Sequence, residues 1–154
     1  MTVANGEYVT ELQVRWSDCD PAGVAYYANY FSFYEAAVVA FMQERGTSWH
    51  ALLDAHGVGF PRVDARCRYL ASVTFGDHIR VRFRVAELRA RVATMRFWID
   101  RVRDGALAAE GEVVIVCLPR RLPGADVARA VELPPSFAEA FGPLLPAPPG
   151  APGP

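Results

Sequence analysis

The sequence predicts an α+β layer fold in which one largely antiparallel sheet curls around a single long helix. Three observations indicate it: a strand-like segment opens the chain, a long apolar helix follows, and four strand-like segments joined by short turns come after the helix. Runs of strands beside a helix are typical of this class. The 154 residues, of which 52% are hydrophobic and 21% charged, fit one ordinary globular domain.

The first strand is predicted from Tyr8 to Trp16, because its side chains alternate with the period of two that a strand requires. One set is Tyr8, Thr10, Leu12, Val14 and Trp16, and the other is Val9, Glu11, Gln13 and Arg15. The helix is predicted from Ala28 to Arg45, because this segment contains neither proline nor glycine and Gly46 stands where a C-terminal cap belongs. The middle of the helix is apolar on nearly every face. Such a helix is expected to be buried on all sides, so the sheet must wrap it.

Four further strands are predicted from the same alternation, with Asp104-Gly105 as a hairpin turn between the last two. These strands span residues 62–69, 79–85, 92–102 and 106–118. Helical turns are expected at 48–56 and at 136–141. One sheet wrapped around one apolar helix is the architecture called the hotdog fold, here with a curved antiparallel five-stranded sheet.

The domain limits follow from composition. Residues 1–141 are predicted to form a single domain, since neither an internal repeat nor a second domain is evident. Residues 142–154 contain six prolines and three glycines, so we expect a Pro/Gly-rich, disordered tail there.

Composition and charge also limit the function. A net charge of −1 argues against binding to nucleic acid or to anionic membranes. We expect no signal peptide and no membrane span, because no apolar run reaches the roughly 18 residues that a span needs. Cys19, Cys67 and Cys117 are odd in number, widely spaced and remote from any histidine cluster, which predicts free thiols in the reducing cytoplasm. We expect neither a metal nor a cofactor.

The segment from Trp16 to Glu35 is the unusual part of the chain, because it carries no charge between Asp20 and Glu35. Asp20 opens a Pro-x-Gly turn that leads into the long helix. Backbone N–H groups at a helix N-terminus can stabilise an oxyanion, and a nearby carboxylate can act as a nucleophile or a general base. From the residues alone, an Asx-type turn that uses the carboxylate to bind backbone N–H groups is an equal alternative for Asp20.

Two motifs give this segment a resemblance to a known family. Asp18-Cys19-Asp20-Pro21-Ala22-Gly23-Val24, followed by Tyr26-Tyr27-x-Asn29-Tyr30, closely resembles the 4-hydroxybenzoyl-CoA thioesterase family in its Pseudomonas-type branch. The similarity runs from about Leu12 to Leu118 in element order, and includes Gly57-x-Gly59-x-Pro61 and the strand ending at Glu87. The resemblance implies a homodimer, often paired into a homotetramer, that hydrolyses an acyl-coenzyme A thioester.

The resemblance also implies the catalytic residues. Asp20 would be the catalytic carboxylate, either as a nucleophile that forms a mixed anhydride or as a general base for water. Tyr27 would present the backbone N–H that binds the oxyanion. Asp18 is expected to be the turn-maker, and Tyr30 and Tyr34 are expected at least in part to pack the core. His50, His56 and His78 are isolated, and no histidine follows the turn motif, which favours an aspartate-led mechanism.

Substrate contacts are implied in the same way. Tyr26 would form an aromatic wall of the acyl pocket, in place of a tryptophan. Glu35 would bind a ring hydroxyl or amine at the far end of the pocket, with a purely structural hydrogen bond as the alternative. Arg89 and Arg91 match a basic cluster that contacts coenzyme A phosphates, although Ala90 replaces one basic member and a solvated turn is the alternative.

A second set of arginines is expected to form the polar outer face of the sheet or an oligomer contact. This set comprises Arg62, Arg66, Arg68, Arg80, Arg82 and Arg84.

Taken together, the sequence and the resemblance predict a cytoplasmic acyl-CoA thioesterase for an aromatic or otherwise compact acyl group. The alternatives are a broader acyl-CoA or acyl-carrier-protein hydrolase, and a hotdog protein that binds acyl-CoA without hydrolysing it.

Overall fold

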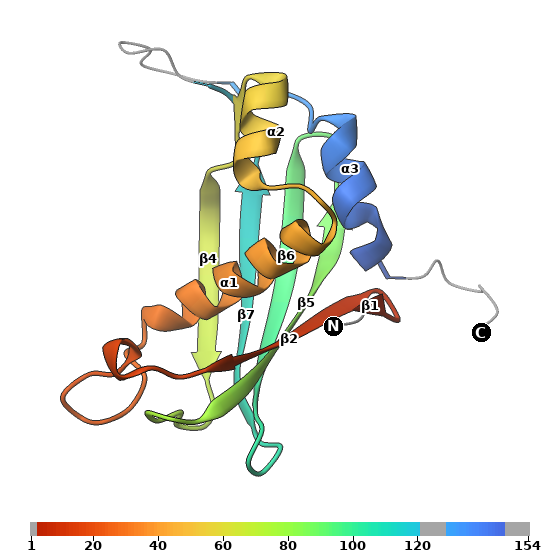
Figure 1. Ribbon diagram of the computed structural model, residues 1–154. Coiled ribbons are helices and arrows are strands. Elements are labelled where there is room, and N and C mark those ends of the chain that lie inside the picture. Colours follow the sequence, from red (N-terminus) through yellow and green to blue (C-terminus); the bar gives the residue numbers. More distant parts are fainter. Residues whose placement is uncertain (1–2, 121–128, 147–154) are drawn as a thin grey trace.

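A computed structural model describes residues 3–120 and 129–146 of the chain. Its main element is one antiparallel sheet that curves around the helix α1 (Asn29–Glu44), as Figure 1 shows. The strands follow the order β1-β2-β5-β6-β7-β4 across the sheet. They are β1 (Val3–Ala4), β2 (Glu7–Gln13), β4 (Arg62–Tyr69), β5 (His78–Leu88), β6 (Val92–Arg101) and β7 (Leu107–Val116). The five predicted strands and the long helix are thereby confirmed, and the two-residue β1 extends the sheet by a short hairpin.

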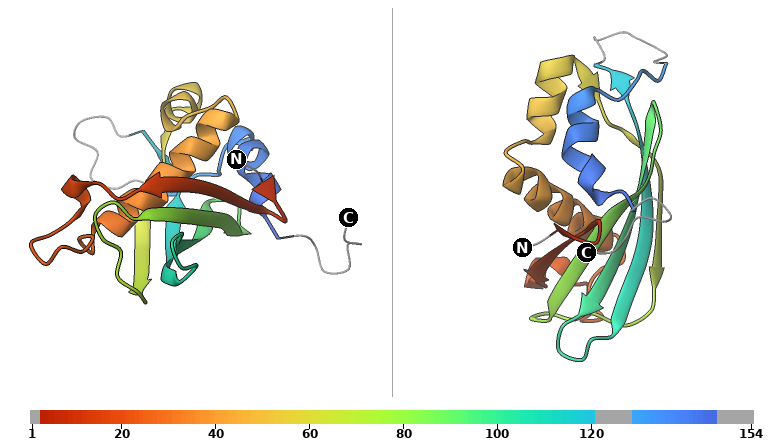
Figure 2. Two further views of the ribbon diagram at one scale, coloured as in Figure 1. Left: turned by 60° about the horizontal axis from the view of Figure 1, so that its bottom comes forward. Right: turned by 90° about the vertical axis from the view of Figure 1, so that its right-hand side faces the viewer.

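The remaining elements cover the ends of this core. A separate small ladder pairs β3 (Val58–Gly59) with β8 (Leu118–Pro119). The short elements are the 3-10 turns η1 (Trp16–Asp18) and η2 (Gly142–Leu144) and the helices α2 (Trp49–His56) and α3 (Pro135–Phe141). All three α-helices lie on the same face of the sheet, which is seen edge-on in the right-hand view of Figure 2. Among the residues that the structure describes, the other face of the sheet carries no helix.

The core lies between α1 and the inner face of the sheet. The helix buries seven side chains there: Tyr30, Phe33, Tyr34, Ala37, Val38, Phe41 and Met42. Alternate residues of β5 and β6 meet them, since side chains on a strand point to opposite faces in turn. Tyr34 stacks on Phe97 with ring centroids 4.5 Å apart. Gly111 of β7 makes room for this ring, because a Cβ there would lie 2.6 Å from Cε2 of Tyr34.

The expectation that α1 is buried on every side is wrong for one face. Ser32 is exposed, and Glu35, Ala36, Val39 and Ala40 are only partly buried. The reason is geometric, because one sheet can cover only one side of a helix. The opposite face of α1 stays open in a single chain although it is rich in alanine and valine.

The end of the domain differs from the predicted boundary at residue 141. Residues 142–144 form η2, and Leu144 is fully buried in the core beside α3. Phe137 and Phe141 of α3 are also fully buried, and both rings lie near the indole of Trp49. The predicted tail therefore starts too early, since these apolar side chains close one end of the core. Its remaining part, 147–154, lies outside the described residues.

No helix within 3–120 or 129–146 combines the length and the apolar character needed to cross a membrane. The three cysteines are free thiols, and Cys117 is buried.

Candidate functional site

The Asp20 turn is held by three hydrogen bonds. The backbone N–H of Asp20 donates to the Val24 carbonyl at 3.0 Å, and Gly23 donates to the Asp20 carbonyl at 2.9 Å. The N–H of Ala22 donates to Oδ1 of the Asp20 carboxylate at 2.8 Å. Gly23 has φ of +80°, a conformation that glycine adopts without strain. The Asx-type turn considered for Asp20 therefore exists, and it fixes the carboxylate. Among the described residues, Oδ2 accepts no hydrogen bond.

Asp18 is the residue that organises the surrounding backbone, as predicted. Its carboxylate is almost buried, accepts a hydrogen bond from the Arg15 backbone N–H at 2.8 Å, and pairs with the Arg15 guanidinium at 3.3 Å. Its carbonyl accepts hydrogen bonds from the Tyr26 backbone N–H at 2.8 Å and from the Asn29 side-chain amide at 2.9 Å. Asp18 thus ties the turn to the start of α1.

Tyr27 lies just before the N-terminus of α1. In the described part of the chain its backbone N–H has no hydrogen-bond partner, whereas the preceding Tyr26 carbonyl accepts one from Asn29 at 2.9 Å. The aligned peptide dipoles of a helix add a partial positive charge at this end. The side chains of Tyr26 and Tyr27 are largely exposed and meet edge to face, with centroids 4.8 Å apart. An anion can therefore approach the free N–H.

Asp20 and Tyr27 line one cavity of about 380 Å³. The opposite wall comes from the end of β4 and the following segment, residues 69–72, and Tyr30 contributes from α1. The walls are joined by a hydrogen bond from the Ala25 N–H to the Val73 carbonyl at 2.7 Å and by a bridge between Val24 and Thr74. A fixed carboxylate and an unpartnered N–H at a helix N-terminus thus share one cavity. This arrangement can stabilise charge on a carbonyl oxygen while a nucleophile attacks the carbon.

Glu35 has two side-chain partners that the sequence did not reveal. The Trp49 indole N–H donates to Oε1 at 2.6 Å, and Arg62 pairs with Oε2 at 2.7 Å. The Arg62 guanidinium also lies over the Trp49 ring, 4.8 Å from its centroid. The structural hydrogen bond considered as the alternative role of Glu35 is therefore present. A contact between Glu35 and a substrate stays a prediction.

Glu35 and Arg62 border a second cavity, of about 260 Å³, between α1 and the sheet. The rest of its lining is apolar or aromatic and comes from α1, β4, β6 and β7. These residues are Phe31, Tyr34, Val38, Ala65, Met95, Phe97, Val113 and Ile115. On α1 its lining runs from Phe31 in the first turn past Glu35 to Val38, and it shares no lining residue with the Asp20 cavity.

Arg62 departs from the set of arginines predicted for the outer face of the sheet. A register irregularity between Arg62 and Asp64, a β-bulge, breaks the alternation at the start of β4. Arg62 consequently bonds to Glu35 of α1, on the helix side, while Arg66 and Arg68 pair with Asp64 and Glu110.

Arg89 and Arg91 do not lie near Asp20 within one chain. They form the β5–β6 turn, and the Arg89 side chain is mostly exposed and pairs with Glu87 at 2.7 Å. The register places this turn at the Arg62 end of β4, because Ile115 of β7 is flanked by Ala93 on one side and Arg62 on the other. The Asp20 cavity lies at the other end, beside Tyr69 and residues 70–72. The eight residues of β4 separate the two ends, a distance of roughly 26 Å.

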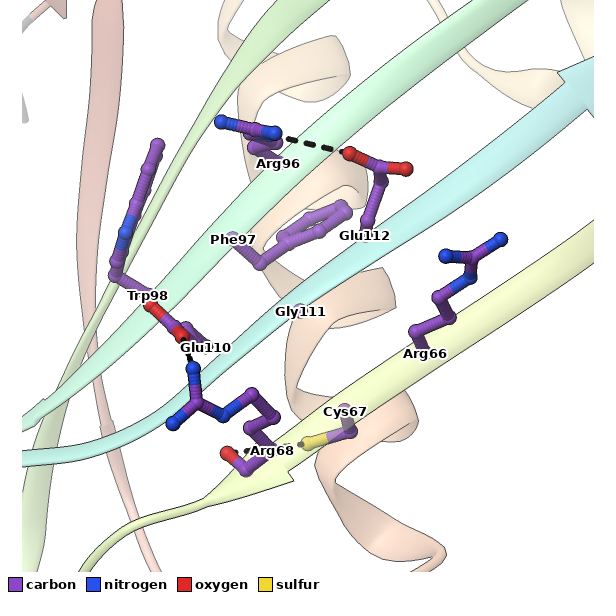
Figure 3. A pocket seen from close by; sticks show the side chains of 9 residues that line it. All are labelled: Arg66, Cys67, Arg68, Arg96, Phe97, Trp98, Glu110, Gly111 and Glu112. Atoms are coloured by element: carbon purple, nitrogen blue, oxygen red, sulfur yellow. Dashed lines mark hydrogen bonds and ion pairs between the residues drawn. The ribbon is translucent and has the colours of Figure 1, made fainter.

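A further cavity, of about 400 Å³, lies on the outer face of the sheet over Gly111 (Figure 3). Its carboxylates are already paired, Glu110 with Arg68 at 3.0 Å and Glu112 with Arg96 at 3.1 Å. These charges neutralise one another. Since the cavity offers no unengaged carboxylate, it is not the candidate site.

Within the described residues, no three His, Cys, Asp or Glu side chains gather as a metal site would require.

His56 makes a hydrogen bond of 2.8 Å with the Ser136 hydroxyl, which joins α2 to α3 at the surface.

Comparison with known proteins places the chain in a family. The profile of the Thioesterase-like superfamily matches residues 14–141. The chain therefore belongs to the Thioesterase-like superfamily. It is 23% identical over 136 residues to the 4-hydroxybenzoyl-CoA thioesterase of Pseudomonas sp. strain CBS-3, covering 84% of this chain and 93% of that protein.

Solved structures confirm the predicted hotdog fold. A 1,4-dihydroxy-2-naphthoyl-CoA thioesterase from Synechocystis has a TM-score of 0.79 at 21% identity, covering 88% of this chain and 96% of its own. A hypothetical protein from Thermus thermophilus has a TM-score of 0.75 at 32% identity, covering 89% of this chain and 98% of its own.

Proposed function

We propose that this protein hydrolyses an acyl-coenzyme A thioester in the cavity that Asp20 and Tyr27 share. One observation carries the proposal: a fixed carboxylate with one free oxygen and an unpartnered backbone N–H at the start of a 16-residue helix line the same cavity. Membership of the superfamily supports it, as do the relatives named as thioesterases.

In the proposed reaction the thioester oxygen accepts a hydrogen bond from the Tyr27 N–H as negative charge develops on it. Asp20 either attacks the carbonyl carbon, giving a mixed anhydride that water then hydrolyses, or removes a proton from an attacking water. In both routes the C–S bond breaks, coenzyme A leaves as the thiol, and the acyl group leaves as a carboxylic acid.

The acyl group is proposed to be aromatic or otherwise compact, and to occupy the cavity that Glu35 and Arg62 border. Its volume of about 260 Å³ lies just below the usual range for small-molecule pockets of roughly 300–1,000 Å³. Aromatic rings of α1 and β6 line it, and Glu35 retains lone pairs for a ring hydroxyl or amine. Tyr26 lines neither this cavity nor the Asp20 cavity in a single chain, and its role as an aromatic wall of the acyl pocket stays a prediction. A broader acyl-CoA or acyl-carrier-protein hydrolase is the alternative within the same chemistry.

The coenzyme A contacts are proposed to need a second copy of the chain. In the described residues β4 pairs only with β7, so its other edge is open, and Val63 and Tyr69 are exposed there. An open edge of this length can pair with the same edge of a partner. If the two β4 strands pair antiparallel about a two-fold axis, the Arg62 end of one β4 lies beside the Tyr69 end of the other. The partner's β5–β6 turn, which carries Arg89 and Arg91, then lies at the Asp20 end of the first chain.

This geometry supports a homodimer, and the charged outer face of the sheet supports further pairing into a homotetramer. Arg89 and Arg91 would then bind phosphate oxygens through their guanidinium groups. Light scattering on the purified protein checks the assembly, and a stable monomer would contradict it. The free thiols are consistent with the proposed cytoplasmic location.

A thiol-release assay on a panel of acyl-CoA esters tests the function. The panel pairs benzoyl and hydroxybenzoyl esters with straight-chain esters of matched carbon number. We expect the highest kcat/KM with a compact or aromatic acyl group. Preference for long straight chains would favour the broader hydrolase, and saturable binding without thiol release would favour the non-catalytic acyl-CoA-binding protein.

A further inference from the structure

The hydroxyl of Tyr69 donates a hydrogen bond of 2.8 Å to the backbone carbonyl of Tyr27. This contact joins the last residue of β4 to the turn before α1, across 42 positions of sequence. Tyr69 also lines the cavity that contains Asp20 and Tyr27. The inference drawn from it rests on the proposed function, because it concerns the backbone N–H of Tyr27.

Tyr27 lies between two peptide groups, and each is fixed by a different partner. In the first, the Tyr26 carbonyl accepts the Asn29 N–H at 2.9 Å, and the Tyr27 N–H of the same peptide is left for the cavity. In the second, the Tyr27 carbonyl has the Tyr69 hydroxyl as its partner. A regular helix would supply the Phe31 N–H to this carbonyl, but Phe31 donates to Ala28 at 3.3 Å instead.

Since Tyr27 precedes the N-cap residue Ala28, its carbonyl has no helical donor, and the Tyr69 hydroxyl is the partner that it has. Without it, the Tyr27 carbonyl has no other partner in the described part of the chain, and the peptide can rotate. Rotation of the Tyr27–Ala28 peptide would bring a carbonyl dipole of the wrong sign toward the developing negative charge, although the Tyr27 N–H itself belongs to the preceding peptide. We infer that Tyr69 is a positioning residue that holds the Tyr27 carbonyl away from the oxyanion, so that the Tyr27 N–H faces it without an opposing dipole.

The surroundings of Tyr69 suit this role. Its ring meets the ring of Tyr30 edge to face at 4.9 Å, and Tyr30 is itself buried, with 4% of its surface exposed. This packing limits the movement of the Tyr69 ring. Burial, together with the nearby Cys67, raises the pKa of Tyr69 to about 12, so its hydroxyl remains a donor at any pH at which the protein would work.

Tyr69→Phe tests the inference, since it removes the hydroxyl and keeps the ring. Loss of a whole oxyanion donor lowers kcat by roughly 10²–10³, so a carbonyl dipole that opposes the donor should lower kcat by at least about tenfold. KM should change by less than about twofold. Affinity for an S-alkyl coenzyme A thioether, which has no carbonyl to use the N–H, should be unchanged.

Tyr8→Phe is the matched control. The Tyr8 hydroxyl donates to Glu44 at 2.7 Å in the core, remote from the cavity, so its removal should lower the thermal midpoint and leave kcat intact. A folded Tyr69→Phe protein with wild-type kcat, or one that only loses thermal stability as Tyr8→Phe does, would overturn the inference while hydrolysis stands. Absence of thiol release by the wild-type protein would overturn the proposed function and this inference together.

Discussion

Replacing Asp20 by asparagine separates its chemical role from its structural one. The Oδ1 atom accepts the Ala22 N–H at 2.8 Å, and the amide oxygen of asparagine can accept the same bond. The two backbone hydrogen bonds of the turn do not involve the side chain at all. The turn should therefore persist, and the free energy of unfolding should change by no more than about 0.5 kcal/mol.

Catalysis should respond very differently, because an amide is neither a useful nucleophile nor a base. Positioned acid–base groups contribute typically 10²–10⁴-fold, so kcat should fall by a factor in that range. This corresponds to about 3–5 kcal/mol of barrier. The assay is thiol release at saturating substrate, with urea denaturation of the same sample to establish that the protein is folded.

Two further aspartates serve as controls. Asp18→Asn removes the charge of a nearly buried carboxylate that bonds to both the backbone N–H and the guanidinium of Arg15. The free energy of unfolding should therefore fall by about 1–3 kcal/mol. Asp54 lies on α2 and forms an exposed ion pair with Arg120. Asp54→Asn should therefore change neither kcat nor the free energy of unfolding. Wild-type kcat in a folded Asp20→Asn protein would refute the assignment of Asp20 as the reagent.

Two predictions concern the acyl cavity and the packing beneath it. Glu35→Gln removes the charge that binds Arg62, and should lower kcat/KM more for hydroxylated benzoyl esters than for the unsubstituted ester; equal losses would rule out contact with the ring substituent. Gly111→Ala places a methyl group 2.6 Å from the Tyr34 ring and 2.7 Å from the Arg66 carbonyl oxygen, and urea denaturation should show a loss of about 1–3 kcal/mol. Unchanged stability would show that both the Tyr34 ring and the β4 backbone can move aside.

The fold could be predicted because its signals are local. Alternation marked the strands, and an apolar segment without glycine or proline marked α1. The structured end of the domain was missed for a compositional reason. The prolines and glycines of residues 142–154 suggested disorder, yet residues 142–144 form η2, and Leu144 fills the open end of the core beside Phe137 and Phe141.

The site was predicted only where its residues are neighbours in sequence. Asp18, Asp20 and Tyr27 fall in one short segment, so a motif could reveal them. The partners of Glu35 are Trp49 and Arg62, which lie on other elements. Arg62 points toward α1 because of a β-bulge in β4, and the alternating sequence of β4 does not reveal this bulge. Tyr69 is 42 residues from Tyr27, and no periodicity links the two.

The separation of Asp20 from Arg89 and Arg91 leads to a decisive test of the two-fold arrangement. If each site combines Asp20 of one chain with the arginines of the other, two defective chains can rebuild one intact site. Asp20→Asn should abolish turnover, and the double variant Arg89→Ala with Arg91→Ala should raise KM by removing phosphate contacts.

In a mixed dimer of these two chains, one site carries both defects and the other carries neither. One site of the two in an isolated mixed dimer should therefore have wild-type kcat/KM; in the unfractionated mixture, where random pairing makes half of all dimers mixed, about one site in four should. Co-expression of the two chains with different affinity tags isolates the mixed dimer for thiol-release assays at low substrate concentration. If instead each site takes all these residues from one chain, every site in the mixed dimer carries a defect and no wild-type activity returns. Recovery therefore distinguishes a site that spans the two-fold axis from one built within a single chain.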